Sequence, residues 1–186
     1  LMCAGLTVFS ALQTWVTPKM RRVGIIGMGG LGHLAVQFAA RMSCEVTAFD
    51  LSAERLVLAK ELGAHHTELT HVSPKGTFDL LIAATAATLD WNHWLRHLTW
   101  GGALCLLGYP AEAIRISPDI LLDGQKIVTG SVVGSPETMR NMLHFAAQHE
   151  VRPIIEELPM REAHEAVARL RANKVRYRMV LKADWE

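Results

Sequence analysis

The chain has 186 residues, of which 50% are hydrophobic and 20% charged, so it is long enough for one ordinary domain and too apolar to be disordered. Nineteen Lys and Arg nearly balance 18 Asp and Glu, and the resulting net charge of +1 argues against a nucleic-acid partner. The longest apolar stretches are shorter than the roughly 20 residues of a membrane span, so no membrane partner is expected.

The first half of the chain predicts strands that alternate with helices. Residues 23–27 form a short run of branched apolar side chains, which is typical of a buried parallel strand. A glycine-rich turn and a helix with apolar spacing follow, and a second strand is predicted at 45–50. Ser52 can cap the next helix, which ends near Gly63. Residues 66–69 could form a short third strand.

The second half repeats this alternation. Strands are predicted at residues 79–83, 103–107, 126–131 and 175–181. Helices are predicted at residues 90–98, from Ser135–Pro136 onward, and at 161–170. Because helices that link successive strands are typical of crossovers on a parallel sheet, we expect an α/β fold. Two such halves make a Rossmann doubly wound parallel sheet with strand order 3-2-1-4-5-6.

The sequence GMGGLG at residues 27–32 matches the GxGxxG pattern of dinucleotide-binding turns. Gly27 would permit the tight turn out of the strand, and Gly29 would let a pyrophosphate approach the backbone. Gly32 would let the following helix pack closely on the sheet. The alternative is a plain tight turn between strand and helix, and the surrounding strand, helix and later acid favour the cofactor-binding interpretation.

Two further features support a cofactor at this turn. The amides of Gly30 and Leu31 would face an anion at the positive end of the helix dipole. Asp50 ends the next strand, where a carboxylate can accept both hydroxyls of an adenosine ribose and repels a 2′-phosphate. NAD is therefore favoured over NADP. Arg55 could flank the ribose or bind a 2′-phosphate, so NADP stays possible, and a solvated acid at a strand end is the simpler alternative.

Four stretches together resemble the zinc-dependent medium-chain alcohol dehydrogenases, most closely their cinnamyl-alcohol-dehydrogenase-like branch. They are residues 1–7, the turn at 27–32, residues 129–135 and residues 173–178. The resemblance implies that Cys3 is one of three protein ligands of a catalytic zinc and that Thr7 lies beside the cofactor. Arg178 would meet the pyrophosphate, with Arg176 as a rival. The residues implied around the nicotinamide half are Ala84, Thr85, Leu107, Gly108, Tyr109, Ser131 and Val132.

The resemblance also implies an organisation in three parts. Residues 1–21 would be a linking helix from a catalytic domain, and residues 22–160 the Rossmann dinucleotide-binding domain. Residues 161–186 would return as a helix and a strand toward the catalytic domain. The family forms homodimers through the dinucleotide-binding domain, so a homodimer is expected. Branch members usually carry small hydroxyl residues in place of Asp50 and Leu51, and many of them prefer NADPH.

In the intact enzyme, the resemblance implies hydride transfer between NAD(P) and a primary alcohol or aldehyde. The other zinc ligands would lie upstream, and the chain begins at Leu1 rather than Met, so we expect a fragment. A catalytic zinc needs three protein ligands and an open position. The chain alone is therefore expected to be inactive, with no catalytic residue of its own, yet able to bind a dinucleotide.

Two other functions stay open. A zinc-free quinone or enoyl reductase of the same superfamily would have no use for a thiolate at Cys3. A stand-alone dinucleotide-sensing module would not need the tail at residues 161–186.

The remaining side chains suggest little further chemistry. Three cysteines are an odd number without a CxxC pair, so a reducing cytoplasm fits better than a disulfide framework. His93 and His97 have the i, i+4 spacing of zinc ligands, but we expect a surface pair because no HExxH pattern is present. His33 could line the cofactor groove or lie on a helix surface. Among the tryptophans, Trp94 is predicted in the core, with Trp91 and Trp100 partly exposed.

Overall fold

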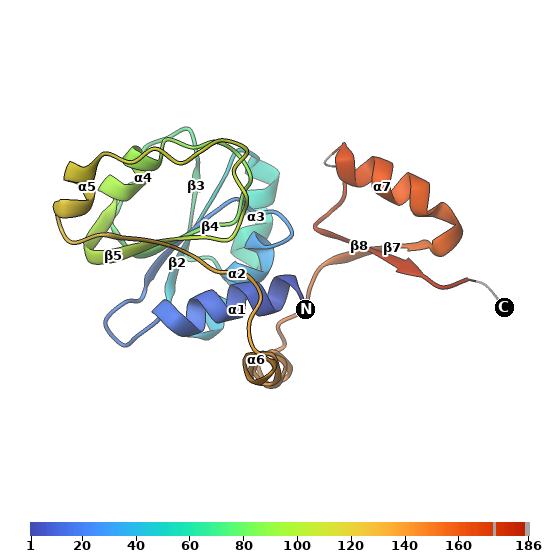
Figure 1. The fold of residues 1–186 in the computed structure, drawn as a ribbon. Coiled ribbons are helices and arrows are strands. Elements are labelled where there is room, and N and C mark those ends of the chain that lie inside the picture. The colour runs from blue at the N-terminus through green and yellow to red at the C-terminus, as the bar shows by residue number, and fades with distance from the viewer. Residues whose placement is uncertain (173, 185–186) are drawn as a thin grey trace. The chain divides into compact units, whose positions relative to one another are not determined.

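A computed structural model describes residues 1–172 and 174–184 of the chain (Figure 1). Residue 173, which opens the fourth resemblance stretch, lies outside them. Contacts divide the chain into a first unit, Leu1–Val151, and a second unit, Arg152–Glu186. The division falls at 151/152, whereas the boundary expected from the sequence lies at 160/161.

The first unit is built on one parallel sheet with the order β3-β2-β1-β4-β5-β6. The strands are β1 (Arg22–Ile26), β2 (Glu45–Asp50), β3 (His66–Leu69), β4 (Phe78–Ala83), β5 (Leu98–Leu106) and β6 (Ile127–Gly130). Each neighbouring pair is parallel. The predicted doubly wound fold and its strand order are confirmed.

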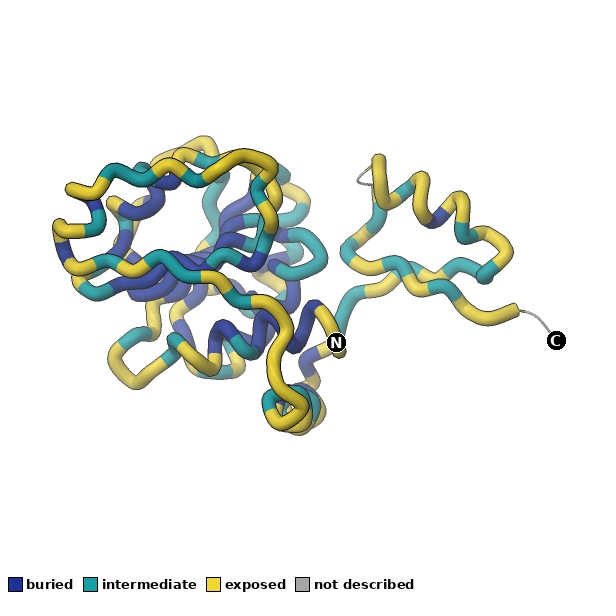
Figure 2. Tube along the Cα trace, in the orientation of Figure 1, coloured by how far each residue is buried: buried dark blue, intermediate teal, exposed yellow. Residues whose placement is uncertain are grey.

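Helices cover both faces of this sheet. They are α1 (Ala4–Trp15), α2 (Gly32–Arg41), α3 (Ala53–Glu61), α4 (Trp91–Arg96), α5 (Pro118–Leu122) and α6 (Pro136–Gln148). One hydrophobic cluster joins the sheet to α1, α2, α3 and α6, through residues such as Leu12, Phe38 and Met142. A second cluster on the other face joins it to α4 and α5, through Trp94 and Ile120. The central strands are buried between these layers (Figure 2).

Local signals in the sequence explain where several helices begin and end. Ser52 Oγ accepts a hydrogen bond from Arg55 N at 3.3 Å at the start of α3. Ser135 Oγ accepts one from Thr138 N at 3.0 Å at the start of α6. Such caps satisfy amides that a helix leaves without partners. Gly63, after the end of α3, has a φ of +114°, which suits glycine.

The second face of the sheet departs from the prediction in several places. Strand β5 begins at Leu98, within the segment predicted as a helix, and its pairing with β4 is irregular between Phe78 and Leu80. Helix α5 was not predicted. Trp91 is only 4% exposed, so its predicted partial exposure is wrong, while Trp100 is 73% exposed. The connection from β3 to β4, residues 70–77, contains no helix.

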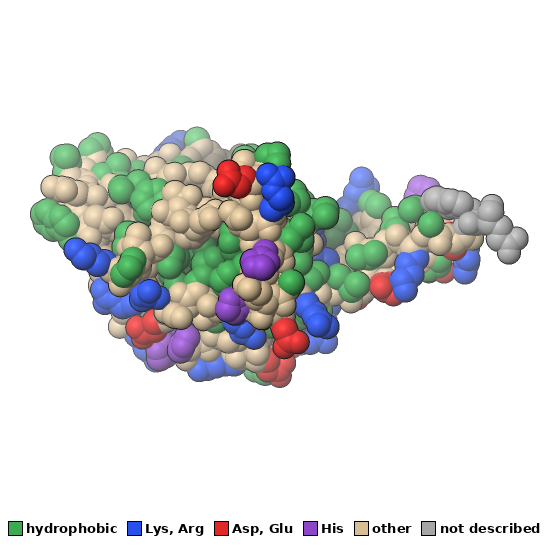
Figure 3. All heavy atoms as spheres, turned by 90° about the horizontal axis from the view of Figure 1, so that it is seen from below, with side chains coloured by type: hydrophobic (Ala, Val, Ile, Leu, Met, Phe, Trp, Pro, Cys, Tyr) green, Lys and Arg blue, Asp and Glu red, His purple; other side chains and the backbone are tan. Residues whose placement is uncertain are grey.

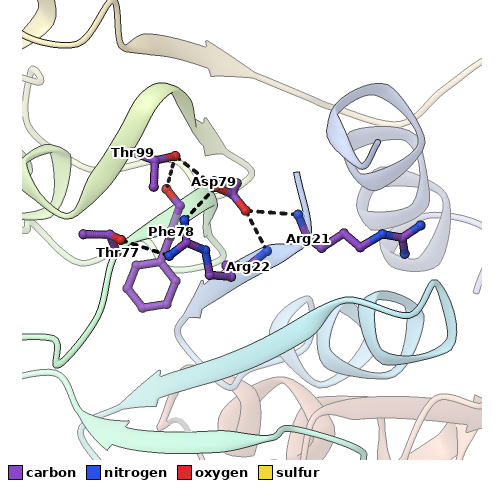
Figure 4. Close-up of polar contacts among 6 residues, drawn as sticks. All are labelled: Arg21, Arg22, Thr77, Phe78, Asp79 and Thr99. Carbon is purple, nitrogen blue, oxygen red and sulfur yellow. Dashed lines mark hydrogen bonds and ion pairs between the residues drawn. The ribbon is translucent and has the colours of Figure 1, made fainter. Parts of the chain in front are cut away.

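The carboxylate of Asp79, near the start of β4, connects this strand to β1 and β5 at the amino ends of the strands (Figure 4). Asp79 Oδ2 accepts hydrogen bonds from Arg21 N at 3.1 Å and Arg22 N at 3.0 Å. Its Oδ1 accepts from Thr99 Oγ1 at 3.0 Å and Arg22 Nη2 at 3.3 Å. Burial raises the pKa of Asp79, but the hydrogen bonds from Arg22 and Thr99 outweigh it and hold the pKa below its usual value.

The second unit contains β7 (Ile155–Pro159), a 3-10 turn (Met160–Glu162), α7 (Ala163–Arg171) and β8 (Arg178–Lys182). Strands β7 and β8 are parallel neighbours, with Ile155 opposite Arg178. Strand β7 was not predicted. Among the described residues of this unit, only Ala166 is buried, so the unit has almost no core of its own.

The surface carries charges of both signs. Basic and acidic side chains are interspersed on the face of the first unit that is visible in Figure 3.

Within the described residues, every helix is too short or too polar to cross a bilayer.

Candidate functional site

The carboxyl ends of four neighbouring strands lie side by side at one edge of the sheet. Ile26 pairs with Ala83, Ala83 with Leu106, and Leu106 with Gly130. Backbone hydrogen bonds continue these pairings one residue further, from Ala84 N to Ile26 O, Leu107 N to Ala83 O and Ser131 N to Leu106 O. The segments that contain the residues implied around a nicotinamide therefore all start at this edge of the sheet, beside the glycine turn. In doubly wound sheets, ligands bind in the crevice outside this edge.

The glycine turn leaves β1 and enters α2 in a conformation that requires glycine. Gly27 has a φ of +93°, a backbone conformation that residues other than glycine rarely adopt. A Cβ on Gly32 would lie 1.8 Å from Gly27 O, so no larger residue fits where the helix meets the turn. No atom lies within 4 Å of the corresponding position on Gly29, and the space in front of its backbone is open.

The amino end of α2 lies next to this open space. Its N-cap residue, Leu31, makes no side-chain capping bond, and its first turn contains no acidic residue. A helix start of this kind favours an anion, because its amides and the helix dipole both attract negative charge.

Asp50 ends β2 and turns its carboxylate toward the glycine turn. Its Oδ2 accepts a hydrogen bond from Met28 N at 2.7 Å, and its Oδ1 accepts one from Ser52 N at 2.9 Å. The side chain is only 8% exposed, and Arg55 Nη1 lies 4.0 Å from Oδ2. Each carboxylate oxygen has two lone pairs, so each can accept one further hydrogen bond.

His33 packs against the glycine turn and is not exposed on the surface of α2. Its side chain is buried, and Nδ1 lies 3.0 Å from Gly29 O, which also accepts the backbone N–H of His33 at 3.1 Å. The possible helix-surface role is therefore wrong. The ring contacts the carbonyl of Gly29, the glycine whose backbone is open to a ligand, and this role was not predicted for His33.

A second close approach lies beside the turn, where β5 ends. A Cβ on Gly108 would lie 2.0 Å from Thr85 O, and one on Gly27 would lie 3.0 Å from Thr85 Cβ. The loops after β1, β4 and β5 are thus in contact. Tyr109 and Val132 lie outside this packing, with 77% and 62% of their surface exposed.

The first turn of α1 contacts the loop that follows β6. Thr7 Oγ1 donates a hydrogen bond to Cys3 O at 3.0 Å and accepts one from Val133 N at 3.0 Å. Cys3 itself is exposed. The structure thus brings Cys3 and Thr7 to the loop that contains Ser131 and Val132.

Other candidates lie elsewhere. Arg178 and its rival Arg176 belong to the second unit, and their contact with a pyrophosphate stays a prediction. In His97, Nδ1 lies 3.2 Å from Gly76 O and Nε2 lies 3.4 Å from Ser73 Oγ, so both ring nitrogens have protein partners.

The described residues contain no group of three His, Cys, Asp or Glu side chains placed to hold a metal ion. A catalytic zinc requires three protein ligands, so Cys3 alone does not make a zinc site. Cys44 and Cys105 are buried free thiols, and burial raises the pKa of Cys105 to about 11.

A doubly wound sheet, a glycine turn open to an anion and an acid at the end of the second strand define a Rossmann-type dinucleotide-binding fold. Comparison with known proteins identifies the family within this fold class. Residues 30–148 match the family model described as zinc-binding dehydrogenase. The chain belongs to this family.

The similarity to known proteins extends over nearly the whole chain. Aldehyde reductase AdhA of Synechocystis is 40% identical, over 97% of this chain and 55% of the relative. NADP-dependent alcohol dehydrogenase C 1 of Mycolicibacterium smegmatis is 37% identical, over 97% of this chain and 53% of the relative. A cinnamyl alcohol dehydrogenase structure from Sorghum bicolor superimposes with a TM-score of 0.88 at 31% identity, covering 99% of this chain and 55% of that one.

The predicted resemblance to zinc-dependent medium-chain alcohol dehydrogenases, in their cinnamyl-alcohol-dehydrogenase-like branch, is confirmed. The chain spans about half the length of the curated relatives it matches.

Proposed function

We propose that this chain is the cofactor-binding half of an alcohol dehydrogenase or aldehyde reductase and binds a nicotinamide dinucleotide at the edge described above. The observation that carries the proposal is the pairing of an open Gly29 with a buried Asp50 carboxylate bonded to Met28 N. When bound, the nicotinamide would exchange hydride with the carbon of a primary alcohol or aldehyde. The chain's own residues would hold and orient the cofactor.

In this proposal the pyrophosphate lies against Gly29 and the amides of Gly30 and Leu31 at the start of α2. Asp50 receives the hydroxyls of the adenosine ribose with the acceptor positions that Met28 and Ser52 leave free. The nicotinamide half extends toward the ends of β4, β5 and β6. Arg178 is kept as the residue proposed to bind the pyrophosphate.

The position of Asp50 favours NAD. A buried carboxylate at the ribose would lie against the 2′-phosphate of NADP and repel it. The Mycolicibacterium relative is named as NADP-dependent, and Arg55 offers a positive charge near the same place. Cofactor choice therefore depends on the balance between Asp50 and Arg55.

Titration with NADH and NADPH, followed by cofactor fluorescence, tests this proposal. We expect NADH to bind more tightly in the wild type. Asp50→Ser should weaken NADH binding by about ten- to a hundredfold, because a charge-assisted hydrogen bond contributes roughly 1.5–3 kcal/mol. The same substitution should strengthen NADPH binding, because it removes the repulsion and leaves Arg55.

The matched control is Glu54→Gln, which neutralises an exposed acid in the first turn of α3 and should leave both affinities unchanged. Melting curves of all three proteins establish that the variants are folded. Binding of neither cofactor to the wild type would overturn the proposed function. A wild-type preference for NADPH would overturn the role of Asp50 alone.

For the family's zinc, Cys3 would be one thiolate ligand in the complete enzyme. The other two protein ligands would have to come from outside the described residues, so we assign no step of the reaction to a metal here.

We also propose that the first unit forms a homodimer through β6. This strand is an edge of the sheet, and Trp100, Leu122 and Ile127 near its start are exposed hydrophobic residues. An exposed edge with apolar side chains favours pairing with another chain. Sedimentation velocity should give a dimer for the wild type and a monomer for Ile127→Lys. A monomeric wild type would contradict this proposal.

A further inference from the structure

The loop after β6 contains a residue in a costly backbone conformation. Val133 has a φ of +49°, in the left-handed region that β-branched residues rarely adopt. The other described non-glycine residues with positive φ are Ser43, Gln125, Glu150 and Tyr177. Val133 is the only β-branched residue among them, so the surrounding structure must hold it in place.

Thr7 provides a contact that holds this residue. Its hydroxyl accepts a hydrogen bond from Val133 N at 3.0 Å, across 126 residues of sequence. The same hydroxyl donates to Cys3 O at 3.0 Å, which fixes its orientation. Thr7 is only 5% exposed. The accepting residue is therefore buried, and the bond from Val133 is part-buried.

The adjacent residues pack the same loop against α1. A Cβ on Gly134 would lie 3.1 Å from Leu6 Cδ1, and the loop begins at Ser131, whose N–H is bonded to Leu106 O. One end of the loop is thus attached to the edge of the sheet and the other to the first turn of α1. The side chain of Val133 nevertheless stays 44% exposed at the proposed nicotinamide end of the site.

We propose that Thr7 is a positioning residue that holds the loop at 131–134, through Val133 N, in the conformation that receives the nicotinamide ring. This inference rests on the proposed function. Holding the loop before the cofactor arrives removes the entropic cost of ordering it on binding. Thr7 would therefore contribute to the affinity for the nicotinamide half and leave the adenosine half unaffected.

The first experiment compares NADH with ADP-ribose, which lacks the nicotinamide ring. Thr7→Val keeps the shape of the side chain and removes the hydroxyl. It should weaken NADH binding by about five- to tenfold, the loss expected for one hydrogen bond, with ADP-ribose affinity changed less than about twofold. Thr7→Ser keeps the hydroxyl and should bind both ligands as the wild type does.

The second experiment separates positioning from direct contact between Thr7 and the cofactor. Val133→Gly relieves the left-handed conformation, because glycine adopts it without a hydroxyl to hold it. If Thr7 acts through Val133, then Thr7→Val should weaken NADH binding much less in the Val133→Gly background than in the wild type. An equal loss in both backgrounds would mean direct contact and would overturn the proposal.

Circular dichroism and melting temperature establish that each variant is folded, and Thr7→Ala replaces Thr7→Val in both comparisons if the valine variant does not fold. Equal weakening of NADH and ADP-ribose by Thr7→Val, or no weakening of either, would also overturn this inference. Failure of the wild type to bind either ligand would instead overturn the proposed function, and this inference with it.

Discussion

Replacing Asp79 by Ala should destabilise the first unit far more than its position at the rim of the sheet suggests. Asp79 accepts hydrogen bonds from Arg21 N, Arg22 N, Arg22 Nη2 and Thr99 Oγ1. The two side chains among these donors have other contacts, since Thr99 Oγ1 is also 3.2 Å from Phe78 O and the guanidinium of Arg22 donates through Nη1 to Thr77 Oγ1 at 3.2 Å. The loss therefore concentrates on the two backbone amides.

The two amides are part-buried, so each should cost about 1 kcal/mol, near the lower end of the range for a donor left without its acceptor, and we expect Asp79→Ala to lower the free energy of unfolding by about 2 kcal/mol. Asp79→Asn keeps one acceptor oxygen and the shape of the side chain, and should cost roughly half as much. Glu112→Ala removes an exposed acid and serves as the control. Surface substitutions of this kind usually stay within about 0.5 kcal/mol.

Urea denaturation followed by tryptophan fluorescence measures these differences, and its pH dependence adds an independent check. The pKa of Asp79 is lowered in the folded state, so its contribution is present above the unfolded-state pKa of about 4 and is lost as the pH falls through the folded-state pKa. Wild-type and Asp79→Asn stabilities should thus converge in acid. A difference below about 0.5 kcal/mol at pH 7, or one that does not shrink below pH 4, would refute this reasoning.

A pair of glycine substitutions tests the close approach beside the site, and modification of the thiols tests the burial of two cysteines. Gly108→Ala places a Cβ 2.0 Å from Thr85 O and should lower the melting temperature and weaken NADH binding, whereas Gly76→Ala meets no atom within 4 Å and should leave both unchanged; similar melting of the two variants would contradict the close approach. Burial raises the pKa values of Cys44 and Cys105, the latter to about 11, so at pH 8 an aromatic disulfide reagent should modify the exposed Cys3 first and the other two only after denaturation. Rapid modification of all three thiols in the native protein would count against this prediction.

The parts of the fold that depend on local sequence were predictable. Apolar strands, the glycine turn and the caps at Ser52 and Ser135 each leave a signal within a few residues, and the alternation of strands and helices determines the parallel sheet. The signals were weaker for β7 and α5, which are short elements with mixed burial. Their conformation depends on packing that the sequence pattern does not display.

The candidate site divides in the same way. The place of Asp50 at the end of its strand was predictable, because it follows from spacing, but its hydrogen bond with Met28 N needed coordinates. Asp79 lies in an otherwise apolar strand, and a lone acid in such a strand is the sequence signal for a structural carboxylate of this kind. The hydrogen bond between Thr7 and Val133 joins segments 126 residues apart, and no local pattern announces such a contact.

The connection between β3 and β4, which lacks a helix, leaves the sheet uncovered beside its outermost strand. A cavity of about 340 Å³ opens there, lined by residues that include Thr47, Glu68 and Lys75. Strand β3 has four residues, none of them buried, so its backbone amides should exchange with solvent sooner than those of the inner strands. Leu69 pairs with Asp50, and Thr70 N donates to the backbone O of Asp50, so this exposed strand is bonded to the backbone of the residue whose carboxylate is proposed to receive the ribose. A cofactor bound at Asp50 should therefore stabilise β3 and slow the exchange of its backbone amides.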